Sequence, residues 1–423
     1  MWTRTLFRLI FLSLFLTNCA KVIAVSLGPE STVGDLWLVG PIAGWAAWTL
    51  IVVARRSPRD LTHAAPLILF CGIVGAHALW RTMIDGAALG LAAFLSWCAW
   101  LGWAGFLQTR SRDATIVAMR VARWFVFLGT MHAVAVLWEA ATGHAFLKVS
   151  SVGSVTRNYG ISVSVAVLGV QLACGVLAAA LLAFTNRRRW NRLLAIFAAL
   201  LQAAALVSTG ARGPMIFLAL AGLAACAPLA FGRTRIVVRI FVFAAIGAAC
   251  AALFFAIAEP ERIAAYYRFL GQSISLIDEG NSTRLDRWTL GIATATSDPI
   301  HMLLGTGAGT TSVLPALTGE DAPTFESSIL KLFVELGAIG LVLWLIPLGV
   351  LGLKTTLALR AAAPDRRSSS RTQNLCLIAF SSMGLVVVLE HLVHDMLSTW
   401  IFASYFWTIL GLLDALTQTQ LRQ

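Results

Sequence analysis

Apolar runs of about twenty residues recur from one end of the chain to the other, and each is long enough to cross a hydrocarbon core of about 30 Å. Of the 423 residues, 58% are hydrophobic and only 12% are charged. A soluble domain of this length carries roughly twice that charged fraction. The pattern therefore predicts an all-α polytopic membrane protein. We expect a single transmembrane domain over residues 1–423 with about twelve helices, separated by short loops. The fifth is expected to end near Thr142 and the seventh to begin near Leu193; the last two are expected at about Leu375–Asp395 and Trp400–Thr417.

The net charge of +12 comes largely from arginines in short loops between the apolar runs, as in RRSPRD and NRRRWNR. Loops of this kind lie in the cytoplasm under the positive-inside rule, which excludes nucleic-acid binding as the reason for the charge. The alternation places both termini in the cytoplasm. It also places one long segment, residues 259–326 between the ninth and tenth helices, on the outer side. The seven cysteines fall within apolar runs and predict neither disulfides nor a metal site.

Several cations lie on the outer side, where topology does not require them. Arg212 stands in STGARGP between two predicted helices, and Gly210 and Gly213 allow a close backbone approach there. Pro214 suits the first turn of the following helix, whose N-terminus favours an anion. Charged residues near a membrane are usually functional, although pairing with lipid headgroups is the simpler alternative. Arg157, in VTRNYG, is a second outer cation.

The segment STRLDRW, residues 282–288, carries Arg284 and Arg287 three residues apart. On a helix, which Ser282 or Thr283 would cap, these two arginines share one face. Guanidinium groups suit bidentate phosphate recognition, and a solvated surface without a ligand is the alternative. Further on, GTGAG contains Gly305 and Gly307; it follows no strand, so it predicts a flexible turn near a substrate instead of a dinucleotide site.

Two groups of acidic residues are candidates for proton transfer. Glu326 opens the tenth predicted helix, where a carboxylate either caps the helix or accepts a proton from a sugar hydroxyl. Glu335 lies deeper in that helix and is expected to pair with Lys331. In EHLVHD, the i, i+4 spacing puts Glu390 and His394 on one face. We expect this cluster, with His391, to form a polar wall, and a catalytic role is the weaker alternative.

These stretches together resemble the O-antigen ligase and polymerase superfamily of bacterial envelope glycosyltransferases. Four pieces occur in order: VTRNYG, STGARGP, STRLDRW followed by GTGAG, and ESSILKLFVELGAIGL. The resemblance implies a GT-C-like helical fold in the bacterial inner membrane and an inverting, metal-independent transferase without a cofactor. It also implies a donor glycan on undecaprenyl diphosphate at the periplasmic face, with Arg212 and Arg284 holding the diphosphate and Arg157 lining the same cavity.

Ligases of this superfamily open the fourth motif with a histidine, whereas this chain has Glu326 there. The difference favours a polymerase of O-antigen, capsule or exopolysaccharide repeat units. We therefore expect Glu326, Arg212 and Arg284 to be catalytic. Substrate binding is expected at Arg157, Arg287, Gly305, Gly307, His391 and His394, with the two histidines as alternative bases. A flippase and a chain-length regulator are possible partners, and a ligase or a transporter of lipid-linked sugar or anions is the alternative function.

Overall fold

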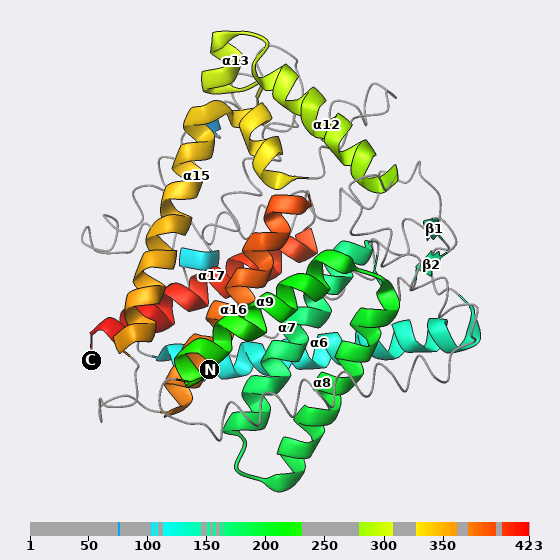
Figure 1. Cartoon of the computed structure of the whole chain (residues 1–423). Coiled ribbons are helices and arrows are strands. Elements are labelled where there is room, and N and C mark those ends of the chain that lie inside the picture. The colour runs from blue at the N-terminus through cyan, green and yellow to red at the C-terminus, as the bar shows by residue number, and fades with distance from the viewer. Residues whose placement is uncertain are drawn as a thin grey trace.

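The computed structural model is a helical bundle with one small hairpin (Figure 1). The structure describes residues 75–76, 103–105, 107–108, 113–144, 150–152, 155–157, 161–162, 164–230, 279–307, 327–361, 371–394 and 400–422. The first two predicted helices, most of the third and fourth, and all of the ninth lie outside these ranges, so the total of twelve stays a prediction. Within the described ranges, five helices are long and apolar enough to cross a membrane, and the chain is a multi-pass membrane protein.

These five spans are α6 (Ala114–Thr142), α7 (Val165–Thr185), α8 (Arg189–Thr209), α15 (Ser328–Ala361) and α16 (Arg371–Val393). The other helices are α9 (Arg212–Ala230), α12 (Glu279–Ala295), α13 (Pro299–Leu304) and α17 (Trp400–Leu421). Several predicted boundaries are confirmed, including the end of α6 at Thr142 and the start of α17 at Trp400. The start of α8 at Arg189 corrects the predicted start at Leu193, because arginine is a good helix former although it lowers hydropathy.

The segment between α6 and α7, which the sequence places in an outer loop with Arg157, contains a short antiparallel hairpin. Strand β1 (Ser150–Val152) pairs with β2 (Val155–Arg157), with Ser150 opposite Arg157. The predicted outer loop likewise contains α12 and α13. Because α12 begins at Glu279, Ser282 and Thr283 lie inside the helix, and the prediction that one of them caps it was wrong.

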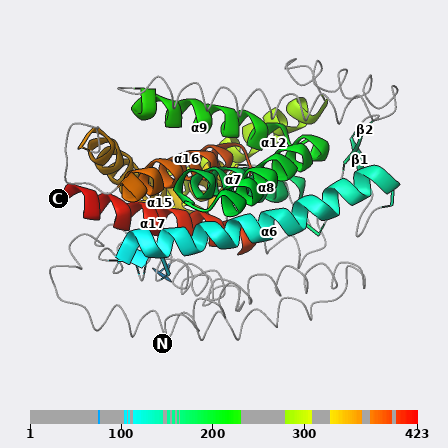
Figure 2. The ribbon, with the colours of Figure 1, turned by 90° about the horizontal axis from the view of Figure 1, so that it is seen from below.

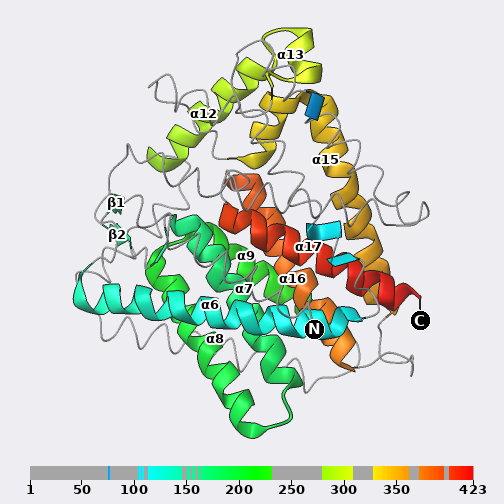
Figure 3. The ribbon, with the colours of Figure 1, turned by 180° about the vertical axis from the view of Figure 1, so that it is seen from behind.

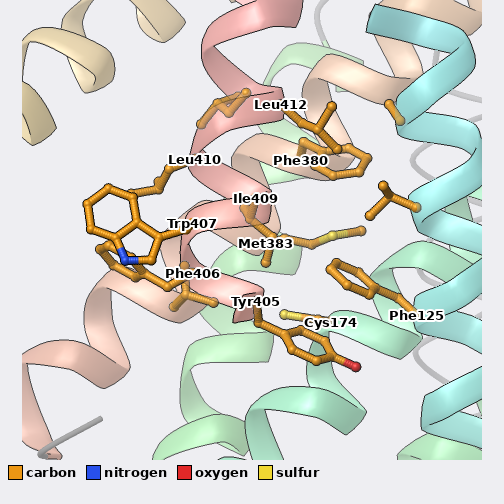
Figure 4. Packing of buried hydrophobic residues seen from close by; sticks show 14 of the residues in the cluster. Phe125, Cys174, Phe380, Met383, Tyr405, Phe406, Trp407, Ile409, Leu410 and Leu412 are labelled. Atoms are coloured by element: carbon orange, nitrogen blue, oxygen red, sulfur yellow. The ribbon is translucent and has the colours of Figure 1, made fainter. Parts of the chain in front are cut away.

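The bundle is layered, with α7 and α16 between α6 on one side and α9 on the other (Figure 2). An aromatic core joins α6, α15, α16 and α17. In it, Phe125 stacks on Tyr405 with ring centroids 4.4 Å apart, and the buried Cys174 lies beside them (Figure 4). Trp344 of α15 packs edge-on against Trp407 of α17. These contacts fix α17 and the long arm of α15 against the rest of the bundle.

Side-chain hydrogen bonds connect α8 to α6 inside this apolar packing. The buried Gln202 donates through Nε2 to the carbonyl oxygen of Val126 at 3.0 Å and to Oγ1 of Thr130 at 2.9 Å. Gly129 and Gly175 leave the room for the amide, since a Cβ at Gly129 would lie 2.9 Å from its oxygen. Side-chain hydrogen bonds of this kind hold membrane helices together where apolar burial gives no preference for helix over lipid.

Helix α15 is bent at Gly337, which has φ 67° and ψ −173° inside the predicted continuous helix. The bend divides α15 into a short arm (328–336) and a long arm (337–361) that meet beside α13 (Figure 1). Seen from behind, α12 extends from α13 away from the bend of α15 (Figure 3). The sequence does not reveal the bend, because a glycine in an apolar run is compatible with a straight helix and with a break in it.

Candidate functional site

The turn between α8 and α9 is buried and tightly closed by its own polar groups. Gly210 ends α8 in the left-handed conformation with φ 67°. Thr209 is fully buried; its hydroxyl donates to the carbonyl of Leu206 at 2.7 Å and accepts from the amide of Ala211 at 3.2 Å. Only Gly210 and Ala211 separate the two helices, so the STGARGP break is much shorter than predicted.

Arg212 is consequently the first residue of α9, not a loop residue, and it is half-buried. Pro214 lies in the first turn of α9, as predicted. Close packing against α7 holds this turn in place, since a Cβ at Gly169 would come within 2.6 Å of the Pro214 ring. Arg212 therefore carries its charge to a helix N-terminus, where backbone N–H groups also favour an anion.

The last turn of α16 faces the first turn of α9. Glu390 is fully buried, and a Cβ at Gly213 would lie 2.9 Å from its Oε2 and 3.2 Å from its Oε1. The close approach predicted for Gly213 is thus confirmed, and the group that uses the space is a carboxylate. Glu390 also lies 2.7 Å from Nδ1 of His394 through its Oε1, which confirms the face that the i, i+4 spacing predicts. The pair is ionic when His394 is protonated.

The end of α16 also holds the start of α15. The carbonyl oxygen of His394 accepts hydrogen bonds from the backbone N–H of Ser328 at 3.2 Å and from its hydroxyl at 3.0 Å. Ser328 is fully buried at this contact. Three segments that are distant in the sequence therefore meet: the first turn of α9, the last turn of α16 and the first turn of α15. We call this cluster, defined by Arg212, Gly213, Ser328, Glu390 and His394, the helix-end cluster.

His391 directly follows Glu390 in α16, but its side chain lies in a different environment. It is buried, and its Nε2 accepts a hydrogen bond from Nε1 of Trp344 at 3.3 Å, which places the ring proton on Nδ1. The imidazole also contacts the ring of Phe406, with centroids 5.2 Å apart. The structure thus places His391 in the aromatic core, whereas His394 is partly exposed beside Glu390.

A second cluster joins α13 to the bend of α15. The amides of Thr306 and Gly307 donate to the carbonyls of Val334 at 2.8 Å and Glu335 at 2.9 Å. These carbonyls end the short arm of α15, and the bend at Gly337 removes the helical amides that they would otherwise bind. We call this contact the glycine junction. Gly305 and Gly307, predicted near a substrate, here attach α13 to α15 through the backbone.

The remaining predicted residues are distributed over several elements. Arg284 and the half-buried Arg287 lie in α12, which packs against α15. Arg157 is the last residue of β2. Lys331 and Glu335 are both buried in the short arm of α15. Glu326 lies outside the described residues, two positions before Ser328.

A bundle of apolar spans with charged and polar groups gathered where helices end defines a multi-pass membrane protein with a polar site at helix termini. Residues 197–345 match the family model described as O-antigen ligase. The match confirms the resemblance for a segment that begins in α8, includes the α8–α9 turn, α12 and α13, and ends in the long arm of α15. The family is one of membrane enzymes that transfer glycans. A search among curated proteins gave no match.

Proposed function

We propose that this protein is a glycosyltransferase that polymerises oligosaccharide repeat units carried on undecaprenyl diphosphate at the periplasmic face of the bacterial inner membrane. The observation that carries the proposal is the helix-end cluster. In it, Gly213, which follows the half-buried Arg212 at the N-terminus of α9, packs against the fully buried carboxylate of Glu390 in α16, and the end of α16 binds the start of α15. Buried charges are costly near a membrane and are usually kept for function.

The roles proposed for the arginines follow from their chemistry and their elements. Arg212 combines a guanidinium with the N–H groups of a helix N-terminus, and both favour a diphosphate. Arg284 would supply the second guanidinium from α12, with Arg287 in the same helix and Arg157 on the hairpin lining the substrate site. Two cations on a departing diphosphate stabilise the charge that develops in the transition state, which is usually the largest catalytic contribution.

Glu326 is the proposed general base. It precedes Ser328 by two residues in the sequence, and Ser328 is fixed by two hydrogen bonds to the end of α16. This anchoring supports a place for Glu326 at the helix-end cluster. His394, partly exposed and paired with Glu390, supports its proposed role in substrate binding and as an alternative base. His391 is the less suitable alternative base, because its Nε2 already accepts a bond from Trp344.

The reaction would proceed in one displacement. A hydroxyl oxygen of the acceptor sugar attacks the anomeric carbon of the donor glycan, and its proton passes to the Glu326 carboxylate. The bond between the anomeric carbon and the diphosphate oxygen breaks, and undecaprenyl diphosphate leaves with the electron pair. Inversion at the anomeric carbon follows from a single attack opposite the leaving group. Arg212 and Arg284 would hold that leaving group.

A ligase is the second candidate, and the description of the matched family model favours it. A ligase would use the same donor and the same arginines but would transfer the glycan to lipid A-core or to a protein. The presence of Glu326, where the ligases of this superfamily have a histidine, favours the polymerase. The two candidates differ in the acceptor and not in the donor site.

The test is an assay of the purified protein with lipid-linked repeat units. We expect longer glycans on the lipid carrier, and at least about a hundredfold loss for Arg212→Ala and Arg284→Ala, the scale of losing one charge-stabilising donor. Arg192→Ala is the matched control, because this arginine is exposed on α8 away from the cluster. Polymer of normal length from either test variant would refute the assignment. Glycan appearing only on added lipid A-core would identify a ligase, and lipid movement without bond formation would identify a transporter.

A further inference from the structure

Helix α13 exposes large apolar side chains to an unusual degree. Of its six residues, Ile300 is 68% exposed, Leu303 and Leu304 are each 47% exposed, and Met302 is 41% exposed. The polar groups are at its start, where Asp298 caps the helix and contacts His301. Four exposed apolar side chains on two turns would be unfavourable in water, because each leaves apolar area uncovered at about 25 cal/mol per Å².

The side chains along the long arm of α15 indicate where α13 lies relative to the membrane. This arm has an exposed apolar stripe at helical spacing, formed by Ile339, Val342, Leu345, Ile346, Val350, Leu353 and Leu357. From Ile339 to Leu357 the stripe is about 27 Å long, close to the hydrocarbon thickness of about 30 Å. Lys354 and Arg360 lie at the far end of the arm. The near end of the stripe therefore marks the opposite boundary of the hydrocarbon core.

Helix α13 is attached at that boundary. The stripe begins two residues after Gly337, and Gly337 packs directly against the backbone of Leu303 and Gly305. The exposed side chains of α13 thus continue the lipid-facing stripe of α15 to the edge of the core. Helix α12 also exposes apolar side chains, at Leu285, Leu290 and Ile292, and extends from α13 across the direction of the long arm (Figures 1 and 3).

We propose that α13 is a lipid-inserted anchor whose exposed apolar residues lie among the acyl chains at the edge of the bilayer. A helix with this distribution binds a membrane surface through its buried apolar area. The glycine junction would hold α13 against α15, and the short link of residues 296–298 would set the height of the adjoining end of α12 at the membrane surface. This inference concerns the lipid contact and does not depend on the proposed reaction.

Spin-label accessibility in nanodiscs tests the anchor without measuring activity. In a background in which the seven native cysteines are replaced by alanine, labels are placed by Ile300→Cys and Leu304→Cys. Val350→Cys on the long arm is the lipid-facing control. Arg188→Cys, exposed between α7 and α8, is the water-facing control. Collision with oxygen reports lipid, and collision with a water-soluble nickel chelate reports water.

We expect the ratio of oxygen to nickel collision at residues 300 and 304 to exceed that at residue 188 at least severalfold and to approach that at residue 350. A ratio equal to that at residue 188 would show that α13 faces water and would overturn the proposal. Labels inaccessible to both reagents would also overturn it, because another part of the chain, a second copy or a partner protein would then cover α13. The Ile300→Cys and Leu304→Cys proteins are used only when their elution volume in size-exclusion chromatography equals that of the parent protein.

Discussion

The glycine junction predicts that an alanine at either of two glycines will separate α13 from α15. Gly305 has φ 79° and ψ 178°, and Gly337 has φ 67° and ψ −173°. This region of backbone conformation is essentially restricted to glycine, and another residue held there costs about 1–3 kcal/mol. The two glycines also face each other closely enough that neither has room for a methyl group.

The size of the effect follows from the distances. A Cβ at Gly337 would lie 2.6 Å from the amide nitrogen of Gly305 and would overlap the carbonyl of Leu303. Relaxing that contact to an ordinary separation of about 3.5 Å moves the two backbones apart by roughly 0.9 Å. The hydrogen bonds from Thr306 to Val334 and from Gly307 to Glu335, now 2.8 and 2.9 Å, would then be lost. Two such bonds contribute about 1–3 kcal/mol in total.

With the backbone cost, the structure predicts a local destabilisation of about 2–6 kcal/mol for Gly337→Ala, and a similar value for Gly305→Ala. The junction would then be open in a large fraction of molecules. Hydrogen exchange of the Thr306 and Gly307 amides, followed by mass spectrometry on the protein in nanodiscs, measures this directly. We expect protection at these two amides to fall at least about thirtyfold, which corresponds to the lower limit of about 2 kcal/mol.

Gly349→Ala is the matched control, because it lies in the same helix and a Cβ there would meet nothing within 4 Å. Alanine is the better helix former, so this variant should exchange at those two amides as the parent does. If Gly305→Ala and Gly337→Ala protect Thr306 and Gly307 as well as Gly349→Ala does, the steric reasoning is refuted. A loss of protection throughout the bundle would also refute it, since the effect is predicted to be local.

Two further predictions concern the helix-end cluster and the start of α13. Gly213→Ala should lower chain extension severalfold, because its Cβ would lie 2.9 Å from Oε2 of Glu390 and displace the carboxylate. Adding the shorter Glu390→Asp to this variant should restore part of the lost activity. If the effects of the two substitutions are strictly additive, the contact is contradicted. Backbone N–H groups, chiefly that of His301, hold the pKa of Asp298 below its usual value, so its capping of α13 should be complete above about pH 4 and be lost as the pH falls through the lowered value. The protection factors of residues 300–304, which correct exchange for the intrinsic rate at each pH, should therefore fall in acid, and Asp298→Asn, which still caps but does not titrate, should abolish that fall.

Among the described residues, the sequence predicts the spans well because hydropathy and charge both report on the membrane. It therefore located the end of α6, most of α16 and the start of α17. It placed the start of α8 too late, because Arg189 and Arg192 disfavour lipid without disfavouring a helix. The same limitation explains why Arg212 was assigned to a loop when it begins α9.

The site was predictable only where its geometry is local. The i, i+4 pair of Glu390 and His394 follows from helical spacing, and the structure confirms it. The contact of Glu390 with Gly213 joins two helices far apart in the sequence, and no spacing rule can predict it. Gly213 itself carried a signal, since a glycine in the first turn of a helix leaves room for a neighbour, but that signal does not name the neighbour. The bend at Gly337 is similar, because only the structure shows that Leu303 and Gly305 occupy the missing side chain's place.

The extent of the family match has a consequence for how the site is assembled. The matched residues 197–345 contain Arg212, the α12 arginines and Ser328, but they end before α16 begins at Arg371. Glu390 and His394 therefore lie outside the match, although Glu390 contacts Gly213 and His394 binds Ser328. A fully buried carboxylate beside Gly213, the residue after Arg212, would alter the electrostatic environment of an anion bound there. If Arg212 binds the donor diphosphate as proposed, α16 contributes to that affinity, and variants of α16 should change donor binding even though the matched segment is intact.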